Sequence, residues 1–180
     1  MKKIRASAKL LFLLFVVLFV GRLALRVGYP LAYMDIINEN AVKYNIDPYF
    51  VVSVIHAESR FAPEATSSKD AKGLMQMREE TAVWCAEQVG LQDFAAERIY
   101  EPSINIVLGV WYLDHLLERY GGDKKLCLAA YNAGMGNVDR WLADGRYSAD
   151  GLTLREVPYP ETARYITKVL NNYAIYKMIY

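Results

Sequence analysis

Apolar residues follow two different patterns along this chain. From Leu10 to Gly21 no side chain is polar, whereas beyond residue 28 apolar residues recur at spacings of three and four. The second pattern is typical of amphipathic helices packed around a core. No segment between residues 28 and 180 alternates with period two for long, so the sequence predicts an all-α domain. Any sheet is expected to be a short hairpin around residues 145–158.

The helical spacing and its end signals define the expected elements. Asp47 and Pro48 form a typical helix start, an N-cap residue followed by proline at the first helical position. Ser103 can cap a later helix, which Gly121 and Gly122 should end. The expected helices cover residues 34–44, 48–60, 79–89, 103–120, 123–132, 137–143 and 161–179.

The uninterrupted apolar segment near the N-terminus predicts a membrane anchor. Basic residues cluster within residues 2–9, and Arg22 and Arg26 follow the segment, which favours a cytoplasmic N-terminus. Twelve apolar residues span only ~18 Å as a helix, short of the ~30 Å hydrocarbon core, but the stretch can continue to Val27. No small-x-small cleavage site follows. We therefore expect residues 1–27 to form a basic cytoplasmic tail and a retained transmembrane signal anchor, rather than a cleaved signal peptide. Residues 28–180 then form one domain outside the cytoplasm.

Charge and cysteine content narrow the function of that domain. Six of the 21 basic residues and none of the 20 acidic ones precede residue 28, which leaves residues 28–180 with a net charge of −5. This charge argues against a nucleic-acid partner. Cys85 and Cys127 have no metal-ligand spacing. A disulfide between them is open, but the apolar helical context of each favours a buried thiol.

Glu58 is the first residue that suggests chemistry. It lies four residues after Val54 and seven after Val51, so it projects from the apolar face of its helix. Desolvation would raise the pKa of this carboxyl and keep a proton available near neutral pH, which suits general acid catalysis. Taken alone, the pattern also fits an ordinary, partly exposed glutamate at a helix end.

Two glycine-marked segments favour the catalytic interpretation. Gly73-Leu74-Met75-Gln76 and Ala130-Tyr131-Asn132-Ala133-Gly134 place amide and phenol side chains beside flexible backbone, a combination suited to binding sugars. Together with Glu58-Ser59 and a final Pro158-Tyr159-x-Glu161-Thr162-x-x-Tyr165 motif, they occur in the order found in soluble lytic transglycosylase catalytic domains. The chain resembles that goose-lysozyme-like family over residues 58–165.

The resemblance implies a reaction that uses a single carboxylate. Glu58 would protonate the glycosidic oxygen between N-acetylmuramic acid and N-acetylglucosamine. It would then deprotonate the muramoyl C6 hydroxyl, which attacks C1 and closes a 1,6-anhydro ring. An internal nucleophile removes the need for a second carboxylate and a positioned water. The partners implied are peptidoglycan glycan strands and the membrane; no cofactor or metal is expected.

The resemblance also implies residues that bind the substrate. Ser67 would contact it near the cleavage site, with Ser68 as the alternative. Gln76, Tyr131 and Asn132 would hold the sugar N-acetyl groups and orient the acid. The last motif would close the cleft from behind; of its members Glu161 and Tyr165, the second is expected to touch Glu58.

One position departs from the family pattern. After Gln76 and Met77 the family continues with methionine and proline, whereas this chain has Arg78 and Glu79. The sugar contact that the resemblance implies at position 78 therefore does not carry over directly, and Arg78 could instead meet a carboxylate of a peptide stem.

Two rival functions remain open in the sequence. Hydrolysis of the same bond would need a second acid, for which Glu64 and Asp70 are local candidates in a polar loop. A membrane-tethered module that binds the wall without cleaving it is the other. Zinc chemistry is disfavoured because His56 and His115 are the only histidines and have no ligand spacing.

Overall fold

The computed structural model describes the backbone of residues 2–180 and the side chains of Lys9 and residues 12–180. The basic residues Lys2, Lys3 and Arg5, and the first apolar residues Leu10 and Leu11, lie outside the described side chains. The α-helices are α1 (Lys2–Gly28), α2 (Met34–Lys43), α3 (Pro48–Glu58), α4 (Glu79–Val89), α5 (Pro102–Arg119), α6 (Lys124–Ala133), α7 (Met135–Ala143) and α8 (Pro160–Ile179). A 3-10 helix, η1 (Ala96–Tyr100), and a two-stranded ladder, β1 (Ala71–Lys72) and β2 (Met77–Arg78), complete the elements.

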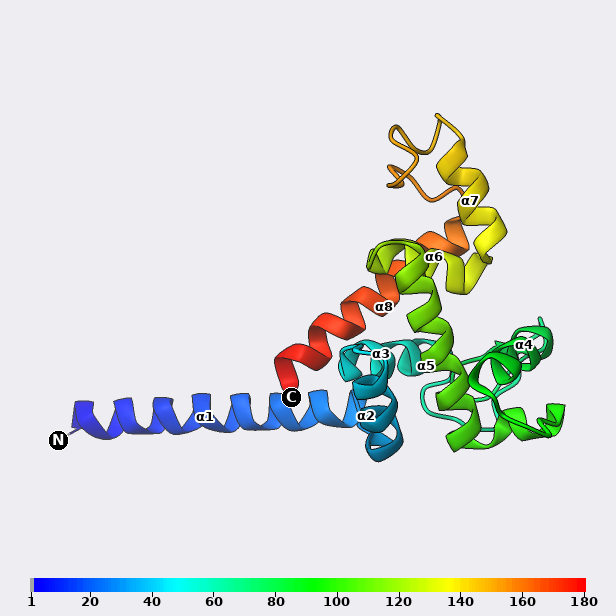
Figure 1. The fold of residues 1–180 in the computed structure, drawn as a ribbon. Coiled ribbons are helices and arrows are strands. Elements are labelled where there is room, and N and C mark those ends of the chain that lie inside the picture. The colour runs from blue at the N-terminus through cyan, green and yellow to red at the C-terminus, as the bar shows by residue number, and fades with distance from the viewer. Residues whose placement is uncertain (1) are drawn as a thin grey trace.

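Helix α3 is the centre of the domain. Its residues from Phe50 to Ile55 are all fully buried, and all of them except Ser53 are apolar. A helix that is apolar on nearly every side is typical of a central position in the core. It packs against α2 and α8, and the long helix α5 packs against α2, α4 and α6 (Figure 1). The predicted all-α fold of the domain is confirmed.

Helix α3 ends earlier than its apolar pattern predicts. Its start agrees with prediction, because Asp47 Oδ1 accepts a hydrogen bond from Tyr49 N at 2.9 Å. Its end lies at Glu58 rather than near Arg60, since Arg60 and Phe61 adopt left-handed backbone with φ of 52° and 65°. Ser59 Oγ donates to Leu74 O at 2.8 Å, and this tertiary contact fixes the helix end beside the hairpin. Glu58 is therefore the last residue of its helix.

Other helices begin slightly before their predicted starts. Helix α5 starts at Pro102 with Glu101 as its N-cap residue, so the predicted cap by Ser103 is wrong. Helices α7 and α8 also begin before residues 137 and 161. Proline at the first position of α5 and α8 explains two of these starts, because its fixed φ suits the first turn and its missing N–H is not needed there.

The predicted hairpin at residues 145–158 is wrong. Asp150 orders that loop instead, with Oδ1 accepting from Leu152 N and Thr153 N, both at 2.8 Å. Within residues 2–180 the sheet is the β1–β2 ladder, which pairs Ala71 with Arg78 and Lys72 with Met77. Strands of two residues are too short to give an alternating pattern, so periodicity could not reveal them.

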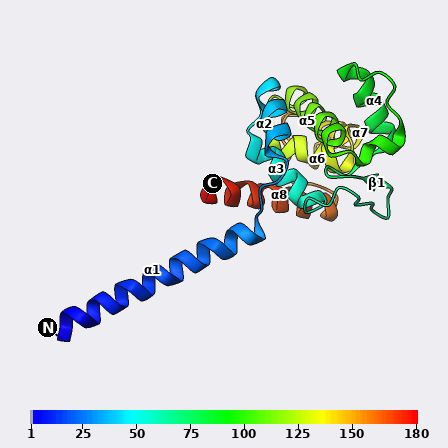
Figure 2. The same cartoon turned by 90° about the horizontal axis from the view of Figure 1, so that it is seen from below.

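Helix α1 projects away from the domain as a separate rod (Figures 1 and 2). It touches the domain near the end of α8, where Arg22 Nη2 donates to Ile179 O at 2.9 Å. The Arg26 guanidinium lies 5.3 Å from the centre of the Tyr180 ring. Most of its large apolar side chains from Phe12 to Val27 are exposed. Among the residues whose side chains are described, no helix combines the length and apolarity of a membrane span.

The two cysteines are buried as free thiols on different helices. Cys85 lies on α4 and Cys127 on α6. Burial raises the pKa of each thiol to about 12, which leaves both protonated and unreactive at neutral pH. The disulfide that the sequence left open is therefore absent from the structure, and the buried-thiol expectation is confirmed.

Candidate active site

A cleft with two compartments surrounds the end of α3. The first, here called the acid pocket, is lined by Glu58, Ser67, Ser68, Lys69, Ala71, Gln76, Arg78, Tyr131, Asn132 and Glu161. The second, the side pocket, is lined by Gln76, Met77, Arg78, Thr81, Tyr112, Tyr131, Asn132, Ala133 and Gly134. The two share four residues and are therefore continuous. Every substrate residue predicted from the sequence lines the acid pocket with Glu58, except Tyr165.

The position of Glu58 perturbs its acidity. The residue is half-buried at the C-terminus of α3, at the floor of the acid pocket. Desolvation raises the pKa of its carboxyl from 4.5 to about 7, while Tyr165 and the charge of Lys168 act in the opposite direction. A carboxyl with a pKa near 7 can both give and take a proton at neutral pH, as an acid that later serves as a base requires.

Tyr165 lies behind Glu58 rather than in the pocket wall. Its hydroxyl oxygen is buried and, among the described residues, makes no hydrogen bond of normal geometry. Glu58 is nevertheless close enough for the two groups to shift one another's pKa values. A buried hydroxyl without a partner costs free energy. The Tyr165 O–H would regain a partner by donating to the Glu58 carboxylate once Glu58 has lost its proton.

The β1–β2 hairpin is held by side chains from α5 and α6 and from the residue that follows α3. Ser59, directly after α3, donates to Leu74 O, and Tyr131 of α6 donates from Oη to Met75 O at 2.7 Å. Asn105 of α5 accepts from Met75 N at 2.7 Å and donates to Lys72 O and Ile99 O at 3.2 and 2.7 Å. The turn that carries Gln76 is therefore fixed relative to Glu58 by contacts that do not depend on the short ladder.

Two glycines allow the hairpin to approach its supports. Gly73 has φ of 77°, and a Cβ there would lie 2.7 Å from Ile99 O and would overlap the Asn105 amide. A Cβ on Gly109 of α5 would lie 2.8 Å from Met75 Cε and would overlap its sulfur. Both positions require the absence of a side chain, so Gly73 and Gly109 allow close packing at the cleft.

The amide and phenol side chains of the cleft are mostly engaged with the protein. Gln76 adopts left-handed backbone, with φ of 48°, and its Nε2 donates to Ala65 O and Gly73 O, both at 3.0 Å. Asn132 Oδ1 accepts from Thr162 Oγ1 at 2.7 Å. That bond fixes the Asn132 amide and leaves its NH₂ group for a ligand. The arrangement orients these groups before a ligand binds, which lowers the entropic cost of binding.

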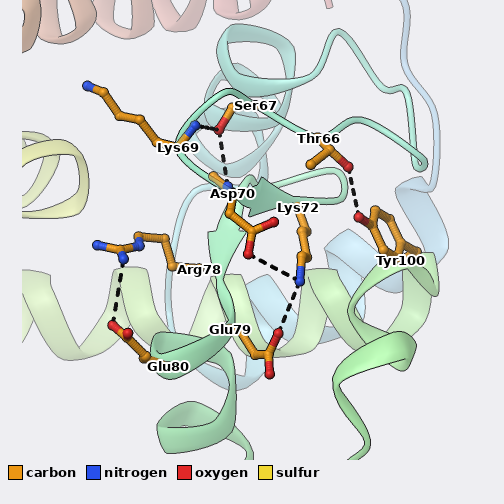
Figure 3. Close-up of polar contacts among 10 residues, drawn as sticks. Thr66, Ser67, Lys69, Asp70, Lys72, Arg78, Glu79, Glu80 and Tyr100 are labelled. Carbon is orange, nitrogen blue, oxygen red and sulfur yellow. Dashed lines mark hydrogen bonds and ion pairs between the residues drawn. The ribbon is translucent and has the colours of Figure 1, made fainter.

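The loop of residues 62–70 forms the rim opposite α6. Ser67 Oγ accepts from Lys69 N and Ala71 N at 3.2 and 3.1 Å, so its own O–H is free to donate (Figure 3). Lys69 Nζ pairs with Glu161 at 2.9 Å and joins this loop to the first turn of α8. Both side chains are more than half exposed, and such pairs contribute only ~0–1 kcal/mol. A ligand that enters the acid pocket can displace this contact at little cost.

The candidate second acids lie apart from Glu58. Glu64 is exposed and lines neither compartment. Asp70 lies 3.4 Å from Lys72 Nζ and also lines neither compartment (Figure 3). The other carboxylate of the acid pocket, Glu161, is paired with Lys69. Among the described residues, no three histidine, cysteine, aspartate or glutamate side chains are placed to share a metal ion.

Sequence reasoning missed two positioning residues of the site. Asn105 is fully buried and holds the hairpin, whereas the sequence placed it only within the expected helix 103–120. Lys168 of α8 donates from Nζ to Ala57 O, next to Glu58, and its charge reaches the acid. The position of Asn105 among the apolar residues of α5 could have indicated a buried polar side chain with a structural role. Nothing local in the sequence marks Lys168, which meets α3 only in the folded chain.

The mostly helical domain, with Glu58 at the end of α3 lining the cleft, has the lysozyme-like fold. The chain belongs to one family with that fold, the transglycosylase SLT domain family, whose sequence profile matches residues 35–151.

Known relatives agree with this assignment. The chain is 30% identical over 151 residues to the soluble lytic murein transglycosylase of Salmonella typhimurium, covering 83% of this chain and 23% of that protein. It is 28% identical over 176 residues to the membrane-bound lytic murein transglycosylase C of Edwardsiella ictaluri, covering 82% and 47%. The structure of the 70-kDa soluble lytic transglycosylase in complex with bulgecin A superposes with a TM-score of 0.77 at 27% identity, over 86% of this chain and 25% of that one. The chain thus spans about a quarter of the length of the soluble relatives it matches.

Proposed function

We propose that the domain of residues 28–180 is a peptidoglycan lytic transglycosylase that uses Glu58 first as the acid and then as the base. The observation that supports this most directly is the raised pKa of Glu58, about 7, in a pocket whose other carboxylate is neutralised by Lys69. One group with a pKa near neutrality can protonate the leaving oxygen and then accept the proton of the C6 hydroxyl. Water activation by a second carboxylate is not required for this route.

Other residues have supporting roles in the proposal. Tyr165 donates to the Glu58 carboxylate between the two proton transfers, and the Asn132 NH₂ group and the Ser67 hydroxyl bind the sugars. Gln76 and Tyr131 shape the turn between the two compartments, since their polar groups are bound to backbone oxygens. Glu161 controls the rim through its pair with Lys69.

The products distinguish this reaction from hydrolysis. Full-length protein acting on isolated peptidoglycan should release muropeptides with 1,6-anhydro ends, which mass analysis detects as products one water lighter than hydrolytic ones. Products that borohydride reduces at a new muramic acid end would instead show hydrolysis. Absence of any released muropeptide, with binding to the wall retained, would favour the non-cleaving module.

The activity should depend on pH through the protonated form of Glu58. Because the first step needs the acid, activity should fall as pH rises through about 7. Replacing Lys168 with methionine removes a positive charge that favours the carboxylate, so the pKa of Glu58 should rise and the falling limb should move to higher pH. The measurement is kcat against pH for the wild-type protein and Lys168→Met. Lys177→Met is the control, because Lys177 pairs with Asp47 away from the cleft; an equal displacement in both variants would contradict the assignment.

We further propose that α1 anchors the domain to the membrane in a single pass, with the domain outside the cytoplasm. The support is the exposed apolar surface of α1, whose described contacts with the domain lie near the end of α8. The membrane-bound relative is consistent with a position at the cell envelope.

Charged substitutions in α1 test the anchor. Phe15 and Phe19 are 63% and 60% exposed. The double substitution Phe15→Arg with Phe19→Arg should move the protein from the detergent-extracted membrane fraction to the soluble one, because two buried arginines cost about 5 kcal/mol or more. Val42→Arg is the control, since Val42 is an 82% exposed apolar residue on α2. The proposal fails if the double variant stays with the membranes as the control does.

A further inference from the structure

Arg78 occupies the junction between the two compartments of the cleft. It is the last residue of β2 and immediately precedes α4, and its side chain lines both the acid pocket and the side pocket. The ladder contact with Ala71 and the hairpin supports described above fix its backbone. Arg78 therefore borders both compartments from a rigid base.

The charge of Arg78 is the least neutralised of those around the hairpin. Lys69 lies 2.9 Å from Glu161, and Lys72 lies 3.0 Å from Glu79. Arg78 Nη2 comes no closer than 3.9 Å to a carboxylate oxygen among the described residues, that of Glu80 (Figure 3). The Arg78 and Glu80 side chains are 63% and 85% exposed, so this pair contributes almost nothing and leaves the guanidinium donors available.

The side pocket has the chemistry of a site for an anion. Among its lining residues Arg78 is the single formally charged one, and none is a carboxylate. Thr81 adds a hydroxyl, and Tyr112 contributes apolar ring surface. A planar guanidinium group on such a wall binds a carboxylate through two parallel hydrogen bonds, which a lysine cannot reproduce.

The proposed substrate offers a carboxylate but not on its sugars. The repeating N-acetylated sugars are neutral once the muramoyl lactyl group is amide-linked, and the negative charges of a strand reside on its peptide stems. Since the two compartments are continuous, a stem attached to a sugar in the acid pocket can reach the side pocket. We propose that the side pocket binds a stem-peptide carboxylate and that Arg78 is the residue that selects for strands bearing stems. This inference rests on the proposed function.

The test compares one variant on two forms of one substrate. Full-length wild-type protein and Arg78→Met are assayed on isolated peptidoglycan and on the same strands after an amidase has removed the stems and the lactyl carboxylates so freed have been converted to methylamides. The loss of kcat/KM caused by Arg78→Met should be about tenfold greater on stem-bearing strands than on stripped ones, and should appear in KM. Arg78→Lys should recover only part of this loss, because lysine restores the positive charge but not the two parallel N–H donors of the guanidinium group. Arg98→Met, a change outside both compartments, should show no such difference between substrates.

A binding measurement keeps this test separate from the test of the reaction. Titration calorimetry with soluble stem-bearing muropeptides is made on Glu58→Gln and on the same protein carrying Arg78→Met. The second change should weaken binding about tenfold if the inference holds. Equal losses on stem-bearing and stripped strands, or unchanged binding of the muropeptide, would overturn it. A wild-type protein that binds but cleaves neither substrate would refute the proposed reaction while leaving the Arg78 site supported.

Discussion

Replacing Glu58 with glutamine should lower the rate of muropeptide release by about a thousandfold, the range expected for loss of general acid–base catalysis. Glutamine keeps the size of the side chain but can neither give the proton to the glycosidic oxygen nor accept one from the C6 hydroxyl. Single-turnover release of anhydro-muropeptides measures the effect. Glu64→Gln is the matched control, because Glu64 is exposed in a neighbouring loop and lines neither compartment. Comparable losses in the two variants would contradict the assignment of Glu58.

The same variant should remain folded and should be more stable at high pH. The pKa of Glu58 is about 7 in the folded protein and about 4.5 when unfolded, so the folded state holds this proton more tightly. The wild-type protein therefore loses stability as pH rises from 4.5 to 7, and glutamine does not titrate. The free energy of unfolding of Glu58→Gln relative to wild type should therefore increase by at most about 3 kcal/mol over that interval. Above pH 7 the difference should stay constant. Urea unfolding at several pH values measures the difference, and a variant less stable than wild type at pH 8 would show that its inactivity has another cause.

Replacing Asn105 with leucine should destabilise the protein by about 3 kcal/mol or more. Leucine fills a similar volume, but Met75 N, Ile99 O and Lys72 O lose their partner inside the protein, and each unsatisfied buried group costs ~1–3 kcal/mol. Activity should fall as well, because the turn that carries Gln76 and borders the acid pocket loses its support from α5. Urea unfolding at one pH, with the free energy extrapolated to water, measures the stability change.

Asn40 provides a matched control for Asn105. It is also buried, but its Nδ2 makes a single local hydrogen bond, to Ile36 O at 2.8 Å. Asn40→Leu should therefore cost ~1 kcal/mol and leave the cleft intact. If Asn105→Leu and Asn40→Leu destabilise the protein equally, the hairpin does not depend on the Asn105 network.

The helices were predictable because their signals are local. The N-cap at Asp47 and the apolar spacing of α5 are set by residues within one or two helical turns, and both predictions were close to the observed elements. The β1–β2 hairpin was not predictable in this way. It owes its position to Ser59, Asn105 and Tyr131, which lie 15 to 56 positions from their partners. The hairpin predicted at 145–158 was wrong because of a local contact. The Asp150 side chain accepts hydrogen bonds from the backbone of this loop, which therefore does not pair as strands.

By itself, the sequence determined an all-α domain, an apolar N-terminal helix, and a glutamate on the apolar face of a helix, because periodicity and ordered motifs are properties of neighbouring residues. Only the tertiary structure decided what surrounds that glutamate. It placed Lys168 beside the acid and Lys69 against Glu161 across 92 positions, and it left Arg78 without a close carboxylate at the junction of two pockets. The physical reason is that pKa and charge pairing depend on desolvation and distance in space, and both are set when helices remote in the chain pack together.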